Sequence, residues 1–128
     1  MILFKPIKSV TEFELKQFNE ISESYDLKFN SADDMLMAFE KTTDNVIVGF
    51  IGFTTNTEYC HIKCFCVRKS FVKKGIGGGL LRIAKIISKK ALYVSLQGND
   101  NMIQYLQKQG FCIKDSQLED DKVIMYTK

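Results

Sequence analysis

Apolar and polar residues along the chain alternate between a two-residue period and a helical period, which is typical of a mixed α/β protein. Short runs of apolar and β-branched residues predict strands. These runs cover residues 2–7, 35–41, 46–53, 59–67, 92–97, 111–115 and 122–127. Helical spacing predicts helices over residues 12–24, along Leu80, Ile83, Ala84 and Ile87, and over residues 99–109. The predicted order is a strand, a helix with room for a second one, three strands, a helix, a strand, a helix and two strands.

Local signals indicate where several of these elements begin and end. Thr11 and Glu14 form a capping-box pattern at the start of the first helix. The apolar face of that helix carries Leu15, Phe18, Ile21 and Tyr25. The polar residues 42–45 predict a turn between two strands, and Gly110 is placed to end the last helix.

The chain has 128 residues and a mass of 14.7 kDa, so we expect one domain over residues 1–128. Lys5 interrupts the first apolar stretch too early for a secretory signal. Every apolar run is far shorter than the ~18 residues of a membrane span. We therefore expect a soluble cytoplasmic protein that engages no membrane, with its four cysteines reduced.

The net charge of +3 is unevenly distributed along the sequence. Residues 1–58 hold five lysines and ten acids, a balance of −5, whereas residues 59–128 hold thirteen Lys and Arg and five acids, a balance of +8. This asymmetry fits an anionic ligand on one side and a cationic ligand on the other, although ordinary solvated faces would give the same numbers.

The segment from Val67 to Leu81 combines the end of a strand, a cluster of glycines and the start of a helix. We call residues 72–78 the glycine turn. Glycines let the backbone approach a ligand, and a helix start offers free N–H groups, so the segment predicts an anion site. A Walker A loop does not fit, and Leu80 stands where a dinucleotide fingerprint needs its third glycine. A tight turn without a ligand remains the alternative.

The same segment resembles the signature of the GNAT family of acetyl-CoA-dependent N-acetyltransferases. Val67 matches the valine that ends a strand, Gly75 and Gly77 match the two glycines, and Val72 stands where the family has Arg or Gln. The resemblance implies that backbone N–H groups of residues 72–77 bind the CoA pyrophosphate, with Lys73 or Lys74 replacing the lost side chain. The cofactor-binding residues that it implies are Phe65, Cys66, Val67, Val72, Lys73, Lys74, Gly75, Ile76, Gly77, Gly78 and Asn99.

A second family motif is matched by Asn99 at a helix start and by Gly110-Phe111 at its end. The two motifs cover residues 59–113. The resemblance implies the GNAT fold, an α/β fold with a mixed, mostly antiparallel central sheet flanked by helices and with strands that splay apart at the CoA site.

The resemblance implies a candidate oxyanion donor and a candidate base. Phe65 N–H would donate to the developing oxyanion. His61, the only histidine, stands where histone-acetylating relatives carry a glutamate base, and its ordinary pKa near 6.5 suits that role. An exposed His61 without function, or Tyr59, Glu58 or water as the base, are the alternatives.

The leaving thiolate is expected to lack the usual acid. Leu106 occupies the family's tyrosine position, and Tyr105 comes one residue earlier. Tyr105 is the candidate acid. A shift of one residue turns a side chain by about 100° around the helix axis, however, so Tyr105 should face the core. Many family members work without such an acid.

Cys60, Cys64 and Cys66 share one strand face by their even spacing. Alternate residues lie about 6.6–6.8 Å apart along a strand, so the three thiols cannot converge on one tetrahedral ion. We interpret them as small buried hydrophobic residues and expect no metal site.

The sequence therefore predicts an enzyme that transfers an acetyl group from acetyl-CoA directly to a primary amine. A small amine or a basic peptide is the expected acceptor, for a monomer or a homodimer. Val72 and Leu106 favour the alternative, a degenerate GNAT module that binds acyl-CoA as a sensor. Nucleic-acid binding by the basic half is not expected, because its lysines cluster where CoA would lie.

Overall fold

The computed structural model describes residues 1–42, 44–97, 100–115 and 122–127. Its helices are α1 (Glu12–Glu23), α2 (Ile76–Ser88), α3 (Asp100–Lys108) and a short 3₁₀ helix, η1 (Lys69–Phe71). Its strands are β1 (Ile2–Ile7), β2 (Asp34–Glu40), β3 (Val46–Thr55), β4 (Tyr59–Val67), β5 (Ala91–Gln97), β6 (Cys112–Asp115) and β7 (Lys122–Tyr126). The elements predicted from the sequence are therefore present, except the optional second helix, since residues 27–33 form a loop.

The strands of the described part of the chain form one sheet of seven, in the order β1-β2-β3-β4-β5-β7-β6. Every neighbouring pair is antiparallel except β4 and β5. The sheet is thus mixed and mostly antiparallel, as predicted.

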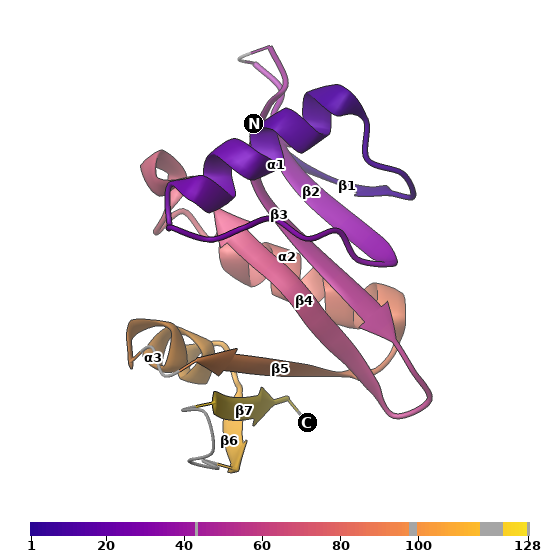
Figure 1. Cartoon of the computed structure of the whole chain (residues 1–128), viewed down its shortest axis with the longest axis vertical. Coiled ribbons are helices and arrows are strands. Elements are labelled where there is room, and N and C mark those ends of the chain that lie inside the picture. Colours follow the sequence, from indigo (N-terminus) through magenta and orange to yellow (C-terminus); the bar gives the residue numbers. More distant parts are fainter. Residues whose placement is uncertain (43, 98–99, 116–121, 128) are drawn as a thin grey trace.

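The parallel pair β4–β5 opens into a fork. Only residues 59–61 of β4 pair with residues 91–93 of β5. Beyond His61, β4 continues along β3 to Val67, whereas β5 continues beside β7. Figure 1 shows the two strands leaving their common end in different directions. The predicted splay is therefore confirmed, and among the described residues it leaves one backbone edge of β4 without a neighbouring strand from residue 62 onward.

Helices cover both faces of the sheet. Helix α1 packs on β3 and β4 from one side, and α2 packs on β2, β3 and β4 from the other (Figure 1). Leu106 of α3 and Phe111 belong to the same buried cluster as Leu80 of α2, whereas Phe18 of α1 and Phe50 belong to a second cluster. Two separate apolar layers thus hold the sheet between α1 and the α2–α3 pair.

The N-terminal end of α1 confirms the predicted capping box. Glu14 N–H donates to Thr11 Oγ1 at 3.2 Å, and Thr11 N–H donates to Glu14 Oε1 at 2.9 Å. Phe18 and Ile21 are buried as expected, but Leu15 is 41% exposed, so it contributes less to the core than its spacing suggested.

A β-bulge in β4 changes which side chains face α1. Gly52 pairs with Cys64 and Phe53 pairs with Ile62, so Lys63 is an extra residue in the ladder. An extra residue reverses the alternation of side chains. Cys60 accordingly lies in the α2 cluster, whereas Cys64 and Cys66 lie in the α1 cluster. The prediction that the three cysteines share one face is wrong for this reason.

Candidate active site

The glycine turn links the end of β4 to the start of α2. Its last residues already belong to α2, which begins at Ile76 with Gly75 as its N-cap residue. Gly75 has a φ of 78°, a left-handed conformation that glycine adopts without strain. No side chain of the residues that the structure describes caps this helix end, and no acid lies in its first turn, although the first helical bond, Gly79 N–H to the Gly75 carbonyl, is formed. The N–H groups before Gly79 therefore suit an anion.

Two lysines and Val72 complete the turn. Lys73 and Lys74 are exposed, and Lys74 Nζ lies 5.0 Å from the centre of the Phe71 ring. Val72 N–H donates to the Lys69 carbonyl at 3.4 Å. This N–H closes the 3₁₀ turn in the structure, so its role in ligand binding stays a prediction.

The three glycines that follow Ile76 are packed by side chains distant in sequence. A Cβ atom at residue 77 would overlap Tyr105 Oη, and one at residue 79 would lie 2.7 Å from a ring atom of Phe4. A Cβ atom at residue 78 would lie 2.9 Å from Gln109 Oε1. Close packing against Tyr105 and Phe4 thus accounts for Gly77 and Gly79, of which Gly77 was predicted to belong to the glycine turn.

We expect the overlap at Gly77 to be measurable as an interaction with Tyr105. Gly77→Ala should destabilise the wild-type protein by about 1–3 kcal/mol, since the new methyl group overpacks the site. In a Tyr105→Phe background the same substitution should cost less, because the nearest atom is gone. Urea unfolding of the four proteins of this double-mutant cycle measures the difference, and equal costs in both backgrounds would contradict the packing seen here.

Tyr105 lies between the fork and the start of α2. Its ring packs against the core, as expected, and also stacks with Phe65 of β4, with centroids 6.3 Å apart and planes 28° apart. Its hydroxyl group reaches Gly77, which sequence analysis did not foresee. Burial raises the pKa of Tyr105, so the phenol keeps its proton at neutral pH. Leu106, at the family's tyrosine position, is 2% exposed and belongs to the core.

Three of the cofactor-binding residues that the resemblance implies, Phe65, Cys66 and Val67, lie on the last part of β4. Phe65 and Val67 are half-buried and pack against the α2 cluster, whereas Cys66 is buried in the α1 cluster. Burial raises the pKa of the Cys66 thiol, which argues against a reactive thiolate. The Val67 carbonyl accepts a hydrogen bond of 2.6 Å from Tyr25 Oη.

His61 lies where the fork begins. It pairs with Thr54 of β3 and Tyr93 of β5, and its ring meets the Tyr93 ring edge-on with centroids 5.0 Å apart. Burial, followed by the nearby Lys63 cation, lowers the pKa of His61 below 6.5. The imidazole is therefore neutral at physiological pH and able to accept a proton.

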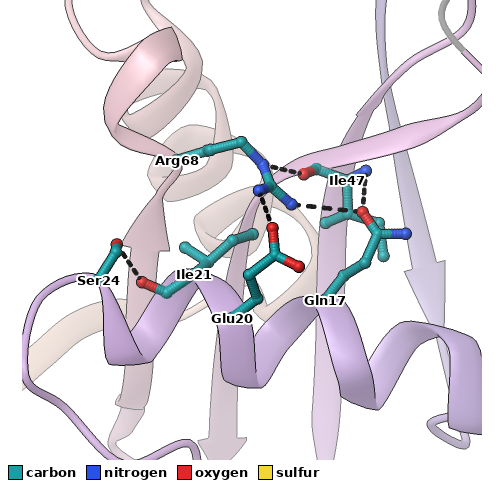
Figure 2. A network of polar contacts seen from close by, with 6 residues as sticks. All are labelled: Gln17, Glu20, Ile21, Ser24, Ile47 and Arg68. Atoms are coloured by element: carbon teal, nitrogen blue, oxygen red, sulfur yellow. Dashed lines mark hydrogen bonds and ion pairs between the residues drawn. The ribbon is translucent and has the colours of Figure 1, made fainter.

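A polar network joins α1 to the residue that follows β4 (Figure 2). Arg68 Nη1 lies 2.6 Å from Glu20 Oε1, and Arg68 Nη2 lies 3.4 Å from Gln17 Oε1. The same Gln17 oxygen accepts the Ile47 N–H at 2.8 Å. This network was not predicted from the sequence, although Gln17, beside Phe18 on the buried side of α1, was an available signal. Tyr25 was expected to lie on the apolar face of the helix.

Asn99, one of the predicted cofactor-binding residues, lies outside the described residues. Within the described ranges, no group of three or more His, Cys, Asp or Glu side chains could hold a metal ion. All four cysteines fall in those ranges and are unpaired thiols. None of the helices in the described part of the chain is long and apolar enough to cross a membrane.

The forked parallel strands and the uncapped, glycine-rich start of α2 define the fold of a CoA-dependent acyltransferase. Residues 6–111 match the Acetyltransferase (GNAT) family. This match spans most of the chain, which therefore belongs to the GNAT family and is an N-acetyltransferase. No curated protein matches the sequence.

Several solved structures have the same fold. Naa50 of Arabidopsis thaliana, in complex with the bisubstrate analogue CoA-Ac-MVNAL, is 18% identical with a TM-score of 0.75, covering 99% of this chain and 98% of that one. PaiA N-acetyltransferase of Thermoplasma acidophilum, with coenzyme A, is 18% identical with a TM-score of 0.74, covering 98% and 99%. A GNAT family acetyltransferase of Elizabethkingia anophelis, with acetyl-CoA bound, is 22% identical with a TM-score of 0.70, covering 99% and 97%.

Proposed function

We propose that the chain transfers the acetyl group of acetyl-CoA directly to a primary amine. The single observation that carries this proposal is the uncapped start of α2 beside the fork between β4 and β5. The N–H groups of Ile76, Gly77 and Gly78, together with Lys73 and Lys74, would hold the pyrophosphate. The solved relatives with acetyl-CoA or CoA bound support this assignment of the ligand.

The fork would hold the pantetheine arm and the thioester. The unpaired edge of β4 offers backbone groups, and Phe65 N–H is the proposed oxyanion donor. The amine nitrogen attacks the thioester carbonyl, the C–N bond forms, and the C–S bond breaks with release of CoA thiolate. Tyr105 is the proposed proton donor to that thiolate, because its phenol is protonated and lies at the fork. Solvent can also supply this proton, since a thiolate with a pKa near 8.5 is a tolerable leaving group.

His61 is the proposed base for the ammonium proton. It lies four residues before Phe65 on β4, with the Lys63 bulge between them. The imidazole would take the proton of the amine near Phe65 directly or through a water molecule. Its neutral state at physiological pH supports this role.

A small amine or a basic peptide is the proposed acceptor. The charge balance of −5 over residues 1–58, which include α1, supports a cationic acceptor. The Arabidopsis relative was solved with a peptide-based bisubstrate analogue, which is in line with an amine acceptor. Electrostatically steered binding weakens as salt rises.

The experiment that tests the proposed function is a measurement of free CoA thiol release. Purified protein is mixed with acetyl-CoA or longer acyl-CoAs and with a panel of polyamines, amino acids and peptides, and products are identified by mass. We expect acetylated amine and CoA in equal amounts. Tight CoA binding without turnover of any amine would instead favour the alternative, a sensor module in which Val72 and Leu106 mark the loss of catalysis.

The salt dependence of turnover tests the acceptor class separately. We expect kcat/KM for a cationic acceptor to fall severalfold between low salt and 0.5 M salt, because screening removes its attraction to the acidic half. A neutral amine serves as the control for salt effects on the CoA site. Efficient turnover of neutral or acidic acceptors alone, without a salt effect, would contradict the cationic assignment.

A further inference from the structure

Three contacts join the carboxyl end of β4 to α1 and to the turn that follows this helix. Tyr25 Oη donates to the Val67 carbonyl at 2.6 Å, the Arg68 guanidinium pairs with Glu20 at 2.6 Å, and Lys69 Nζ lies 5.0 Å from the centre of the Tyr25 ring. We call these contacts the α1 tether. They involve three consecutive residues, so they fix the direction in which the chain leaves the sheet.

Arg68 is the centre of the α1 tether because every polar part of it is engaged. Its N–H donates to the Val48 carbonyl at 2.6 Å, and its Nε donates to the Ile47 carbonyl at 2.9 Å. Its own carbonyl accepts the Phe71 N–H at 2.8 Å, which closes η1. Figure 2 shows the guanidinium between α1 and Ile47 of β3. One residue thus connects α1, β3 and η1.

The short helix η1 carries this connection into the glycine turn. Phe71 is its last residue, and Val72 N–H still donates to the Lys69 carbonyl. Lys74, inside the turn, lies with its Nζ over the Phe71 ring. The path from Arg68 to Gly75 is therefore short and hydrogen-bonded over its first half, so a change in the position of Arg68 is expected to move the turn.

We propose that Arg68 and Tyr25 are positioning residues, through which α1 sets the position of the glycine turn and hence the affinity for acetyl-CoA. This inference rests on the proposed binding of CoA at that turn. It gives α1 a role besides covering the sheet, since a helix of the acidic half also controls the donor site. Neither side chain is placed on the reacting atoms, so the chemical step itself should be unaffected.

Glu20→Gln gives the sharpest test, because two explanations predict opposite signs. Removal of a negative charge near an anionic ligand should strengthen CoA binding by simple electrostatics. Loss of the ion pair that orients Arg68 should weaken CoA binding instead, by about two- to threefold for a pair with one partner exposed. Glu23→Gln is the matched control. Glu23 is an exposed acid of the same helix, and its substitution removes the same charge.

Tyr25→Phe and substitutions at Arg68 test the other contacts of the tether. Tyr25→Phe removes only the hydroxyl on the Val67 carbonyl and should weaken CoA binding about threefold to tenfold. Arg68→Met keeps the length of the stem but loses the forked donors, and should weaken it about tenfold or more. Arg68→Lys should recover part of that loss, because an ammonium can reach Glu20 but cannot bond Ile47 and Gln17 at the same time.

Calorimetric titration with CoA, at a temperature well below the unfolding midpoint of each variant, gives these affinities. Steady-state kinetics distinguishes a positioning role from a general loss of native structure. We expect KM for acetyl-CoA to rise, with kcat at saturating donor and KM for the acceptor close to wild type. Unchanged CoA affinity in folded Tyr25→Phe and Arg68→Met proteins, or tighter binding by Glu20→Gln, would overturn the inference. A wild-type protein that does not bind CoA would overturn the proposed function itself. If Arg68→Met does not fold, the Tyr25 and Glu20 variants still decide the question.

Discussion

Gly75→Asp should weaken CoA binding roughly 100-fold without unfolding the protein. Gly75 is the left-handed N-cap of α2, and a Cβ atom built there meets no atom within 4 Å. Asp tolerates the left-handed region better than most residues, so the side chain can be accommodated. Its carboxylate would lie beside the proposed pyrophosphate site. A charge about 5 Å from each of two phosphate charges costs roughly 3 kcal/mol at an effective dielectric constant of about 40, which weakens binding roughly 100-fold.

Gly75→Asn is the matched control for this prediction. Asn has the same size and the same tolerance of the left-handed conformation, but it carries no charge. We expect it to bind CoA much more tightly than the aspartate variant, and both variants to unfold at similar temperatures. Gly77→Asp would be a poorer choice, because a side chain at residue 77 also collides with Tyr105. Calorimetry that finds wild-type affinity in folded Gly75→Asp would exclude the glycine turn as the CoA site.

The parts of the fold that sequence analysis predicted well depend on local signals. The ranges predicted for β1 and β4 are those observed, and the capping box of Thr11 and Glu14 forms as expected. Each of these features is determined by residues within a few positions of one another. The start of α2 belongs to the same group, since the glycines followed by an apolar helix face predicted it from the sequence.

The bulge in β4 could not be predicted, because it depends on the neighbouring strand. The sequence 59–67 reads as an unbroken strand, and even spacing placed Cys60 and Cys64 on one face. In the structure, Gly52 of β3 leaves room for the Cys64 thiol, and Lys63 is displaced from the ladder. No residue within β4 marks this position, since lysine is common on exposed strand faces. The error therefore arose from a pairing that involves residues about twelve positions apart.

The contacts that shape the candidate site are even more distant in sequence. Gly77 is a glycine because Tyr105 fills the space beside it, and Gly79 because Phe4 does. Arg68 pairs with Glu20, 48 residues earlier in the chain. The family motif predicted a glycine-rich turn between β4 and α2, which the structure has, and assigned its glycines to ligand binding. Three-dimensional packing divides them instead into one turn residue, Gly75, and helix residues that admit close neighbours.

Loss of the proposed base should reduce turnover strongly while leaving donor binding intact. His61→Ala is expected to lower kcat/KM roughly 100-fold, the usual size of a general-base contribution. The CoA affinity should stay close to wild type, because His61 lies at the base of the fork and not at the glycine turn. Exogenous imidazole should restore part of the lost activity, since it can occupy the vacated space and take the proton. His61→Gln, which keeps a polar side chain without a titrating group, is the control for the loss of volume.

The pH profile provides the decisive measurement of this role. A base acts in its neutral form, so activity should rise with pH through the pKa of His61, which burial and Lys63 hold below 6.5. The acidic limb of kcat/KM should therefore lie below that value in the wild type and disappear in His61→Ala. Lys63→Gln removes the nearby cation, so the pKa should rise and the limb should move to higher pH; the shift should be small because Lys63 is exposed. Near-full activity of His61→Ala with an unchanged profile would mean that water or another group takes the ammonium proton.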